Sequence, residues 1–378
     1  MIKTELKICI FCGARPNFIK VAPIIRKINQ QSKDETKRKV SYKMVYVGKP
    51  ADPTIEDGLF IDLDIKRPDV CLGVTCKNLN ELTGQVMSKF ETYLQENKTD
   101  VVIVVDDLAS TMAASIVAKK QGLLLAHIAA GTRSFDITMP KEINRLVIDG
   151  LSDILFTAGL SNNSIANKEG AELSKVYMVG NCLIDNIRFN REKMKSMSLD
   201  NIEKIKGLEL KRNNYLVFTL NRKALINDKS KLESIIETIV TSAGDKTIVA
   251  PLRSSAIKAI ATLDIAKSNK FKNFKITMPL GYLEFVFLVA NSLGIITDSG
   301  NVAEEATFNS IPCATINSYT EHIETVKEGS NILVGEDTKE LANAIKLMIN
   351  KKWKESNIPN RWDGRSAERI LQILMELG

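Results

Sequence analysis

Histidine is scarce in this chain of 378 residues, with only His127 and His322 present. Few side chains that titrate near neutral pH are therefore available for acid–base chemistry. Cys9 and Cys12 form a CxxC, but the pair lies inside the apolar, strand-like segment KICIFCG. Neither a second CxxC nor a histidine follows at the spacing of a zinc site. We expect no metal site, and we interpret all six cysteines as buried and uncharged.

Long apolar runs, a signal-peptide pattern and a dinucleotide-binding glycine motif are also absent. No apolar run approaches the roughly 18 residues of a membrane helix, and the N-terminus leads directly into a strand-like segment. We therefore expect a cytoplasmic protein that does not bind membranes. No GxGxxG follows a predicted strand, so we expect no dinucleotide or other cofactor. The net charge of +7 is modest and the lysine runs lie beside acids, which argues against nucleic-acid binding.

Short β-branched, apolar segments alternate with amphipathic stretches along the chain, which predicts βαβ units and parallel sheets. The predicted strands are KICIFCG, KMVYVG, VVIVVDD, LLLAHIAA, ILFTAG and VYMVG in the first half, and YLVFTL, TIVAPL, FKITMP, GIITDSG, CATIN and ILVG in the second. A polar, lysine-rich stretch separates the halves, so we expect the domain boundary within residues 187–212. The sequence predicts an α/β protein with two doubly wound sheets, whose strand ends face a shared ligand cleft.

The first strand is followed by Gly13-Ala14-Arg15-Pro16-Asn17-Phe18-Ile19-Lys20, a turn that opens a helix. Gly13 permits a tight turn, Pro16 suits the first helical turn, and free backbone N–H groups there attract anions. Arg15 and Lys20 add two cations, which are unfavourable at a helix start unless an anion joins them. The alternative is that these side chains form a solvated surface.

A second turn of this kind is Thr297-Asp298-Ser299-Gly300-Asn301-Val302-Ala303-Glu304-Glu305. Its small residues allow backbone amides to approach a diphosphate closely. Glu305 lies about one and a half turns into the helix, where its carboxylate can accept hydrogen bonds from ribose hydroxyls. Alternatively, Glu304 and Glu305 only complement the helix dipole.

Several segments, in the same order along nearly the whole chain, resemble the motif series of the non-hydrolysing UDP-N-acetylglucosamine 2-epimerases. They are GARPNFIKVAPII, HIAAGTRS, MPKEINR, VGNCLID, MPLGYLEF, ITDSGNVAEE and WDGRSAER. The resemblance implies a GT-B-type fold with two Rossmann-like domains. It implies an N-terminal domain at residues 1–187, with a helix at 364–378 that packs back on it, and a UDP-binding domain at residues 188–363. Family members form homodimers, so the resemblance also implies a homodimer.

For the site, the resemblance implies that UDP lies in the cleft, with the uracil near Phe285 and the ribose held by Glu305. Asp107 and Glu142 match the positions of a catalytic aspartate and glutamate. The other positions that the resemblance assigns to the UDP-sugar, mainly to its phosphates, are Arg15, Lys20, Arg145, Ser299, Gly300, Asn301 and His322.

The implied reaction inverts C2 of the N-acetylglucosamine unit by elimination and re-addition of UDP. The C2 proton is not acidic, so acid–base groups and cations for the departing UDP are needed. At such positions this chain has Ala129 for Glu, Asn221 for His and His322 for Arg, while Asn301 and Asp106 each replace a glycine. Ala129 and Asn221 cannot transfer a proton, and each such loss typically costs about 100- to 10,000-fold in rate. Losses within one constellation are not additive.

Three hypotheses follow. The first is a working UDP-N-acetylglucosamine 2-epimerase, an isomerase that supplies surface-polysaccharide synthesis. The second is an inactive or weak relative that binds a UDP-sugar and regulates or assembles with an active partner, which Ala129 and Asn221 favour. The third is a GT-B glycosyltransferase or an epimerase for another nucleotide sugar, since a fold does not fix a chemistry. The expected ligand is UDP-N-acetylglucosamine or a related UDP-sugar.

Overall fold

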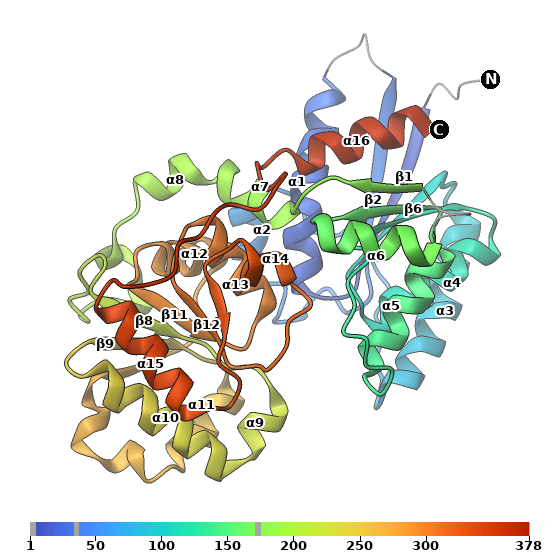
Figure 1. The fold of residues 1–378 in the computed structure, drawn as a ribbon. Helices are drawn as coiled ribbons and strands as arrows, with labels where there is room; N and C mark the ends of the chain where they lie inside the picture. The colour runs from blue at the N-terminus through green and yellow to red at the C-terminus, as the bar shows by residue number, and fades with distance from the viewer. Residues whose placement is uncertain (1–4, 34–37, 171–174, 378) are drawn as a thin grey trace. The chain divides into compact units, whose positions relative to one another are not determined.

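A computed structural model describes residues 5–33, 38–170 and 175–377. The chain divides into two compact units. Unit 1 comprises Met1–Phe189 and Asn360–Gly378, and unit 2 comprises Asn190–Pro359. The last segment of the chain, red in Figure 1, therefore belongs to the same unit as the first segments, in blue.

Unit 1 contains a seven-stranded parallel sheet with the order β3-β2-β1-β4-β5-β6-β7. Its strands are β1 (Glu5–Cys12), β2 (Lys39–Tyr46), β3 (Val70–Cys71), β4 (Val101–Val105), β5 (Leu124–Ile128), β6 (Ile154–Thr157) and β7 (Lys175–Met178). Its helices are α1 (Arg15–Gln31), α2 (Asp57–Leu63), α3 (Leu79–Glu96), α4 (Ala109–Lys120), α5 (Pro140–Leu151), α6 (Leu160–Gly170), α7 (Cys182–Phe189) and α16 (Ser366–Leu377).

Unit 2 contains a six-stranded parallel sheet with the order β10-β9-β8-β11-β12-β13. Its strands are β8 (Tyr215–Phe218), β9 (Thr247–Pro251), β10 (Phe274–Thr277), β11 (Gly294–Thr297), β12 (Cys313–Thr315) and β13 (Asn331–Leu333). Its α-helices are α8 (Arg191–Lys195), α9 (Lys223–Asn227), α10 (Lys229–Ala243), α11 (Ser254–Ala261), α12 (Tyr282–Ala290), α13 (Gly300–Phe308), α14 (Ile323–Lys327) and α15 (Thr338–Ile349). Short 3₁₀ helices lie at Leu199–Asn201, Glu203–Ile205, Ile265–Lys267 and Asn269–Asn273.

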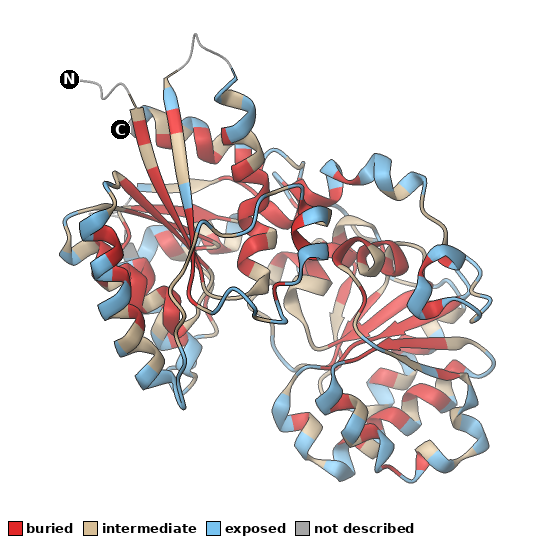
Figure 2. Cartoon of the chain, turned by 180° about the vertical axis from the view of Figure 1, so that it is seen from behind, coloured by how far each residue is buried: buried red, intermediate tan, exposed pale blue. Residues whose placement is uncertain are grey.

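The central strands of both sheets are buried along their whole length, as Figure 2 shows in red. Parallel strands covered by helices on both faces have this continuous apolar pattern, because both sides of the sheet face a core. In unit 1 the core includes an edge-on ring contact between Phe11 and Phe90, at 5.0 Å between centroids. The predicted α/β class with two doubly wound parallel sheets is confirmed.

Some expectations at the level of single elements need correction. The strand β3 was not predicted, because two residues carry no readable periodicity. The interpretation of all six cysteines as buried is wrong for Cys71, which is half-buried, and for Cys76, which is exposed. Cys71 lies in the edge strand β3, and Cys76 lies in the loop before α3. In the described part of the chain, no helix is long and apolar enough to cross a bilayer.

The strand order reverses between β1 and β4 in unit 1, and between β8 and β11 in unit 2. At such a switch point the connections leave the sheet in opposite directions and open a crevice at the carboxyl ends of the strands. The turn at Gly13 follows β1 and the turn at Ser299 follows β11. Both predicted turns therefore lie at the switch point of their own sheet.

Asp185 of α7 anchors the start of α16 within unit 1. Its carboxylate accepts hydrogen bonds from the amides of Ser366, at 3.1 Å, and Ala367, at 2.8 Å. Burial raises the pKa of Asp185, although both amides act to lower it. The first amides of a helix have no acceptor inside the helix, so this carboxylate replaces the missing partner.

Replacing Asp185 by alanine should lower the free energy of unfolding by about 1–3 kcal/mol, because two buried amides lose their acceptor. Urea denaturation followed by circular dichroism measures the change. Asp185→Asn keeps one acceptor oxygen, so its free energy of unfolding should fall by less than that of the alanine variant. Equal losses in the two variants would show that the hydrogen bonds to α16 are not what Asp185 contributes.

Candidate functional site

The start of α1 is organised by Asn17. Its Oδ1 accepts hydrogen bonds from the backbone amides of Gly13, at 2.8 Å, and Ala14, at 3.1 Å. The backbone amide of Asn17 donates to the Ala14 carbonyl oxygen. The prediction of free amides for an anion is therefore wrong for these three groups, and Pro16 has no N–H. A Cβ on Gly13 would collide with Ser110, so glycine is required for close packing. An anion at this turn must be bound mainly by side chains.

Lys20 and Asp106 form an ion pair at the same place. Lys20 Nζ lies 2.5 Å from Asp106 Oδ1, and Asn17 Nδ2 donates to Asp106 Oδ2 at 2.8 Å. The Lys20 side chain is 7% exposed and the Asp106 side chain 18%. Asp106 directly follows β4 and has a φ of 59°, in the left-handed region that favours glycine. Lys20, which the sequence analysis assigned to a phosphate, is therefore already paired with the carboxylate of Asp106.

A buried network fixes the backbone of Asp106. His127 Nε2 lies 3.0 Å from the Asp106 carbonyl oxygen, and His127 Nδ1 lies 2.6 Å from Asp149 Oδ1. Asp149 also pairs with Arg133 and accepts from the Gly131 amide. Burial opposes ionisation of Asp149, but His127, Arg133 and the amide outweigh it and lower its pKa. One of the two histidines is thus part of the structural support of this turn.

Asp107, Glu142 and Arg145 form the second charged cluster of unit 1. Arg145 Nε and Nη2 donate to Asp107 Oδ2 at 2.9 and 2.7 Å, and Nη1 donates to Glu142 Oε2 at 3.1 Å. Lys141 Nζ lies 3.2 Å from the other oxygen of Asp107. Glu142 is 3% exposed and Arg145 is 5% exposed. The structure therefore brings together three residues that the sequence analysis assigned to the site.

Both carboxyl groups of this cluster are held in the ionised form. Burial acts to raise the pKa of Asp107, but Lys141 and Arg145 outweigh it and lower the pKa below its ordinary value. Burial likewise acts to raise the pKa of Glu142. Ser134, Arg145 and the Phe135 amide donate to its carboxylate and lower the pKa. At neutral pH these groups can accept a proton rather than donate one.

Ala129, where the resemblance leads us to expect a glutamate, follows β5. Ala129 is half-buried and has a φ of 69°, and its carbonyl accepts from the Thr132 hydroxyl at 3.0 Å. β5 is the neighbour of β4 in the sheet. Ala129 therefore lies at the same sheet edge as Asp106 and Asp107, without a side chain that can titrate.

In unit 2, Asp298 ties together the two strand ends at the switch point. Its Oδ2 accepts from the amides of Asn221, at 2.7 Å, and Arg222, at 2.5 Å. Asn221 follows β8, whereas Asp298 follows β11. Asn317 Nδ2 donates to the Asp298 carbonyl at 3.3 Å. Asn221 is an exposed residue, so its own side chain lies at the surface of unit 2.

The second turn that the sequence analysis selected lies at the start of α13. Ser299 is the N-cap residue, with its amide donating to Thr297 Oγ1 at 3.0 Å, and the following amides have no acceptor inside the helix. His322 packs over Gly300, where a Cβ would collide with its ring. His322 Nδ1 lies 2.8 Å from Glu304 Oε1. Ser299, Gly300 and His322 thus lie together at one helix start that favours anions.

Glu305 lies on α13, and Phe285 lies on the neighbouring helix α12. Glu305 is 7% exposed, and burial together with the charge of Glu304 raises its pKa to about 8. Phe285 lies on α12, which packs against α13, and it is half-buried against the core. Asn301 is half-buried in the first turn of α13. These assigned residues of unit 2 belong to two neighbouring helices.

The structure adds three residues that the sequence analysis did not assign to the site. Asn17 caps α1, Asp106 pairs with Lys20, and Asp298 joins the ends of β8 and β11. Asp106 and Asp298 each directly follow a buried strand at a switch point, and this position can be recognised in the sequence. Their partners lie far away along the chain, so the pairs themselves cannot be predicted from it.

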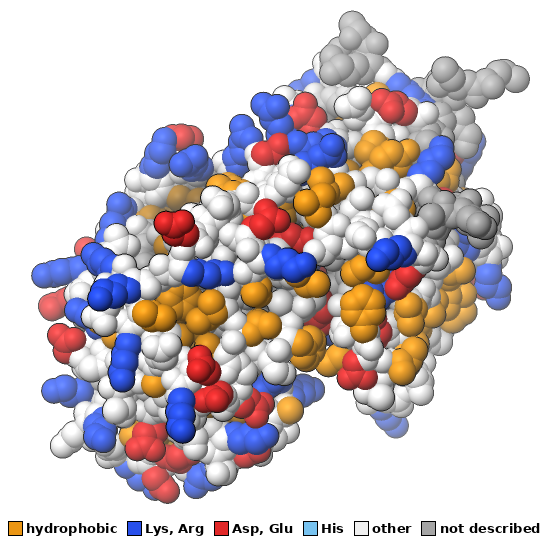
Figure 3. All heavy atoms as spheres, in the orientation of Figure 1, with side chains coloured by type: hydrophobic (Ala, Val, Ile, Leu, Met, Phe, Trp, Pro, Cys, Tyr) orange, Lys and Arg blue, Asp and Glu red, His pale blue; other side chains and the backbone are white. Residues whose placement is uncertain are grey.

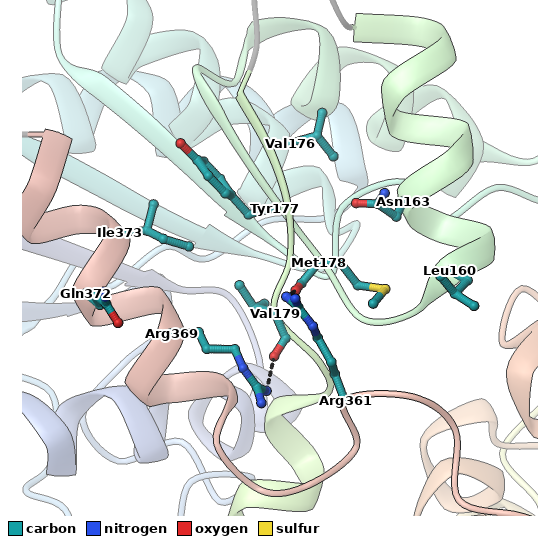
Figure 4. A pocket seen from close by; sticks show the side chains of 10 residues that line it. All are labelled: Leu160, Asn163, Val176, Tyr177, Met178, Val179, Arg361, Arg369, Gln372 and Ile373. Carbon is teal, nitrogen blue, oxygen red and sulfur yellow. Dashed lines mark hydrogen bonds between the residues drawn. The ribbon is translucent and has the colours of Figure 1, made fainter.

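A separate pocket of about 390 Å³ lies in unit 1 beside the edge strand β7 (Figure 4). It is lined by residues of α6, β7 and α16 and of the segment before α16: Leu160, Asn163, Val176, Tyr177, Met178, Val179, Arg361, Arg369, Gln372 and Ile373. Arg361 donates to the Met178 carbonyl, and Arg369 donates to the Val179 carbonyl at 2.9 Å. Both arginines therefore cover carbonyl groups at the sheet edge.

Comparison with known proteins extends these observations. The model of the family described as UDP-N-acetylglucosamine 2-epimerase matches residues 33–375. The chain is 34% identical to the UDP-N-acetylglucosamine 2-epimerase of Methanocaldococcus jannaschii, over 98% of this chain and 99% of the relative. It is 29% identical to the UDP-2,3-diacetamido-2,3-dideoxy-D-glucuronate 2-epimerase of Pseudomonas aeruginosa, over 98% of this chain and 100% of that protein.

The crystal structure of the Methanocaldococcus jannaschii enzyme in complex with UDP-GlcNAc and UDP matches this chain with a TM-score of 0.83 and 32% identity. The match covers 98% of this chain and 100% of that one. The two Rossmann-like units thus make this an α/β protein of the GT-B type. The chain belongs to the UDP-N-acetylglucosamine 2-epimerase family, as the resemblance of its motifs indicates.

The raised pKa of Glu305 predicts a pH-dependent stability. Between its ordinary value of 4.5 and about 8, the folded protein holds a proton that the unfolded chain has lost. The free energy of unfolding should therefore fall as pH rises through this range, by at most about 1.4 kcal/mol per pH unit from this group. Glu305→Gln removes the titration, so the variant should gain stability relative to the wild type between pH 6 and pH 9.

Urea denaturation of both proteins at the two pH values measures this difference. Glu340→Gln, at an exposed position of α15, is the matched control and should show no relative gain. If the free energy of unfolding changed equally between the two pH values in Glu305→Gln and in the wild type, the result would contradict a buried Glu305 that holds a proton.

Proposed function

We propose that the protein binds UDP-N-acetylglucosamine and interconverts its gluco and manno forms by eliminating and re-adding UDP. The observation that carries this proposal is the cluster of Asp107, Arg145 and Glu142 at the carboxyl edge of the sheet, in a chain of this family. The relative with 34% identity bears the name of this enzyme. A structure of that relative contains UDP-GlcNAc and UDP, which supports the choice of ligand.

In this proposal, unit 2 binds the UDP part of the ligand. The pyrophosphate accepts hydrogen bonds from the first amides of α13, at Ser299, Gly300 and Asn301, because a helix start favours negative charge. Glu305 accepts from the ribose hydroxyls and Phe285 contacts the uracil. Because the carboxyl group of Glu305 has a pKa of about 8, strong acceptance from the ribose requires it to lose its proton when UDP binds at neutral pH.

Unit 1 supplies the groups for the sugar and for the departing phosphate. Arg15 and Lys20 are the groups of unit 1 that are assigned to the phosphate, and His322 is assigned to it at the start of α13 in unit 2. Arg145 holds Asp107 and Glu142 in place beside the sugar. Each unit thus carries residues that are assigned to the pyrophosphate.

The chemistry requires a base for the C2 proton and stabilisation of the leaving group. As the C2–H bond breaks, its proton passes to a carboxylate, its electron pair forms the C1–C2 double bond, and the C1–O bond pair leaves with UDP. On re-addition, a phosphate oxygen of UDP bonds to C1 while the electron pair of the C1–C2 double bond takes a proton at the other face of C2. The second carboxyl group donates this proton and has first gained it from water. Asp107 and Glu142 are ionised and are the assigned groups for these proton transfers. Because Ala129 and Asn221 do not titrate, we expect a slow enzyme.

Incubation with UDP-N-acetylglucosamine in deuterated water tests the proposal. Proton NMR should show loss of the C2 proton signal and the appearance of the manno sugar. Asp107→Asn should slow both at least about 100-fold, since it removes one acid–base group. UDP-2,3-diacetamido-2,3-dideoxy-D-glucuronate serves as a second substrate, because a relative is named for it. UDP binding without exchange on either sugar would contradict epimerisation and leave a binding protein.

Restoring the missing groups gives an independent test. The double variant Ala129→Glu, Asn221→His should raise the rate by about 100-fold or more, because each restored group can transfer a proton. Ala129→Gln with Asn221→Gln is the matched control, with similar bulk and no titration. No gain in the restored protein, with UDP binding unchanged, would show that these positions do not limit the rate.

We also propose a cytoplasmic homodimer. All six cysteines are free thiols, as is usual in a reducing compartment. Exposed apolar side chains gather on α5 and the loop before it, at Phe135, Ile137, Ile143 and Leu146, and Figure 3 shows apolar side chains over the region of α5. Ile143 and Leu146 are three residues apart and so share one helix face. A second copy of the chain would cover this surface.

Leu146→Glu should convert the dimer to a monomer at micromolar concentration, because it places a charge in the proposed apolar contact. Size-exclusion chromatography with light scattering measures the mass. Ile358→Glu, at an exposed apolar position of unit 2, is the control and should remain dimeric. A monomeric wild type, or a dimeric Leu146→Glu variant, would contradict this interface.

A further inference from the structure

The ion pair of Lys20 and Asp106 occupies the place where unit 1 would meet a phosphate. Both carboxylate oxygens of Asp106 are engaged by α1, one by Lys20 Nζ at 2.5 Å and the other by Asn17 Nδ2 at 2.8 Å. Lys20 is 6% exposed. A buried ammonium group requires a nearby anion, and here the chain itself provides one.

The position of Asp106 is costly for a residue with a side chain. Its φ of 59° lies in a region that glycine adopts more easily, and its carbonyl is fixed by His127. Aspartate tolerates this conformation better than most residues, but glycine would meet the backbone requirement alone. The turn geometry therefore does not explain the carboxylate, whereas the charge of Lys20 does.

We propose that Asp106 is a built-in anion that occupies Lys20 in the free protein, so that a UDP-sugar gains Lys20 only by displacing the Asp106 carboxylate. Asp106 thereby sets the affinity for the diphosphate and acts as a positioning residue rather than a catalytic one. This inference rests on the proposed function, because it concerns the same phosphate site. An anion that binds beside Asp106 without displacing it meets a like charge, which also weakens binding.

Titration calorimetry with UDP on the full-length protein tests the inference. Asp106→Asn keeps the size and the contact with Asn17 but removes the charge, and it should bind UDP about tenfold more tightly or better. Asp106→Gly should show the same gain in affinity for UDP, and glycine also adopts the positive φ at this position without strain. The affinity of both variants should also fall more steeply with salt than that of the wild type, because one more cation is available to the phosphates.

A double-mutant cycle with Lys20 separates this role from a structural one. Lys20→Met should weaken UDP binding by less than about threefold in the wild type, because the lysine is already paired. In the Asp106→Asn background the same change should abolish the gain. Asp64→Gly is the control for the backbone, since Asp64 also has a positive φ, of 53°, at an exposed helix end. It should leave UDP affinity unchanged.

The outcomes distinguish this inference from the proposed function. If the wild type binds UDP, and folded Asp106→Asn and Asp106→Gly variants bind it equally or more weakly, the role of Asp106 is refuted and the UDP site stands. If neither the wild type nor either variant binds UDP, the UDP site is refuted and this inference with it. Should Asp106→Asn fail to fold, the Asp106→Gly variant decides, because glycine suits the backbone at this position.

Discussion

Compensation of buried cations at the carboxyl edge of one sheet is the constraint on which the site in unit 1 depends. Lys20 and Arg145 come from helices that follow different strands, and each is nearly inaccessible to water. Two consecutive acids at the end of β4 provide their partners, Asp106 for Lys20 and Asp107 for Arg145. Because the sheet reverses its strand order beside β4, both helix ends reach this one edge. In the proposed function, a ligand at this edge therefore exchanges partners with charges that are already paired.

In the proposed function, unit 2 binds a phosphate group by different means. The helix start at Ser299 presents backbone amides. The ring of His322 can lie close to the backbone there because residue 300 is a glycine. Asp298 fixes the geometry by joining the ends of β8 and β11. In unit 1 the corresponding amides of Gly13 and Ala14 donate to Asn17 Oδ1. Charged side chains must therefore bind an anion there in place of these amides. Unit 2 thus has backbone dipoles at this place and unit 1 has side-chain charges, and a single carboxylate such as Asp106 can change the effect of the side-chain charges.

Much of this arrangement is readable from the sequence. The alternation of β-branched and amphipathic segments predicts both parallel sheets, and the motif series locates Asp107, Glu142 and the turn at Ser299. What could not be predicted depends on contacts between distant segments. Lys20 and Asp106 are 86 residues apart, and no local pattern links them. The capping by Asn17 reverses the expectation of free amides at α1, because a polar side chain three residues into the turn can either bind a ligand or bind its own backbone. Burial of Glu305, and hence its raised pKa, likewise follows only from the packing of α13.

The central claim is that a diphosphate takes Lys20 from Asp106 in unit 1. A crystal structure of the protein with UDP measures this directly. We expect the pyrophosphate within hydrogen-bond distance of Lys20 Nζ, with the Asp106 carboxylate turned away. A pyrophosphate remote from Lys20, or bound with the ion pair of Lys20 and Asp106 intact, would contradict this claim.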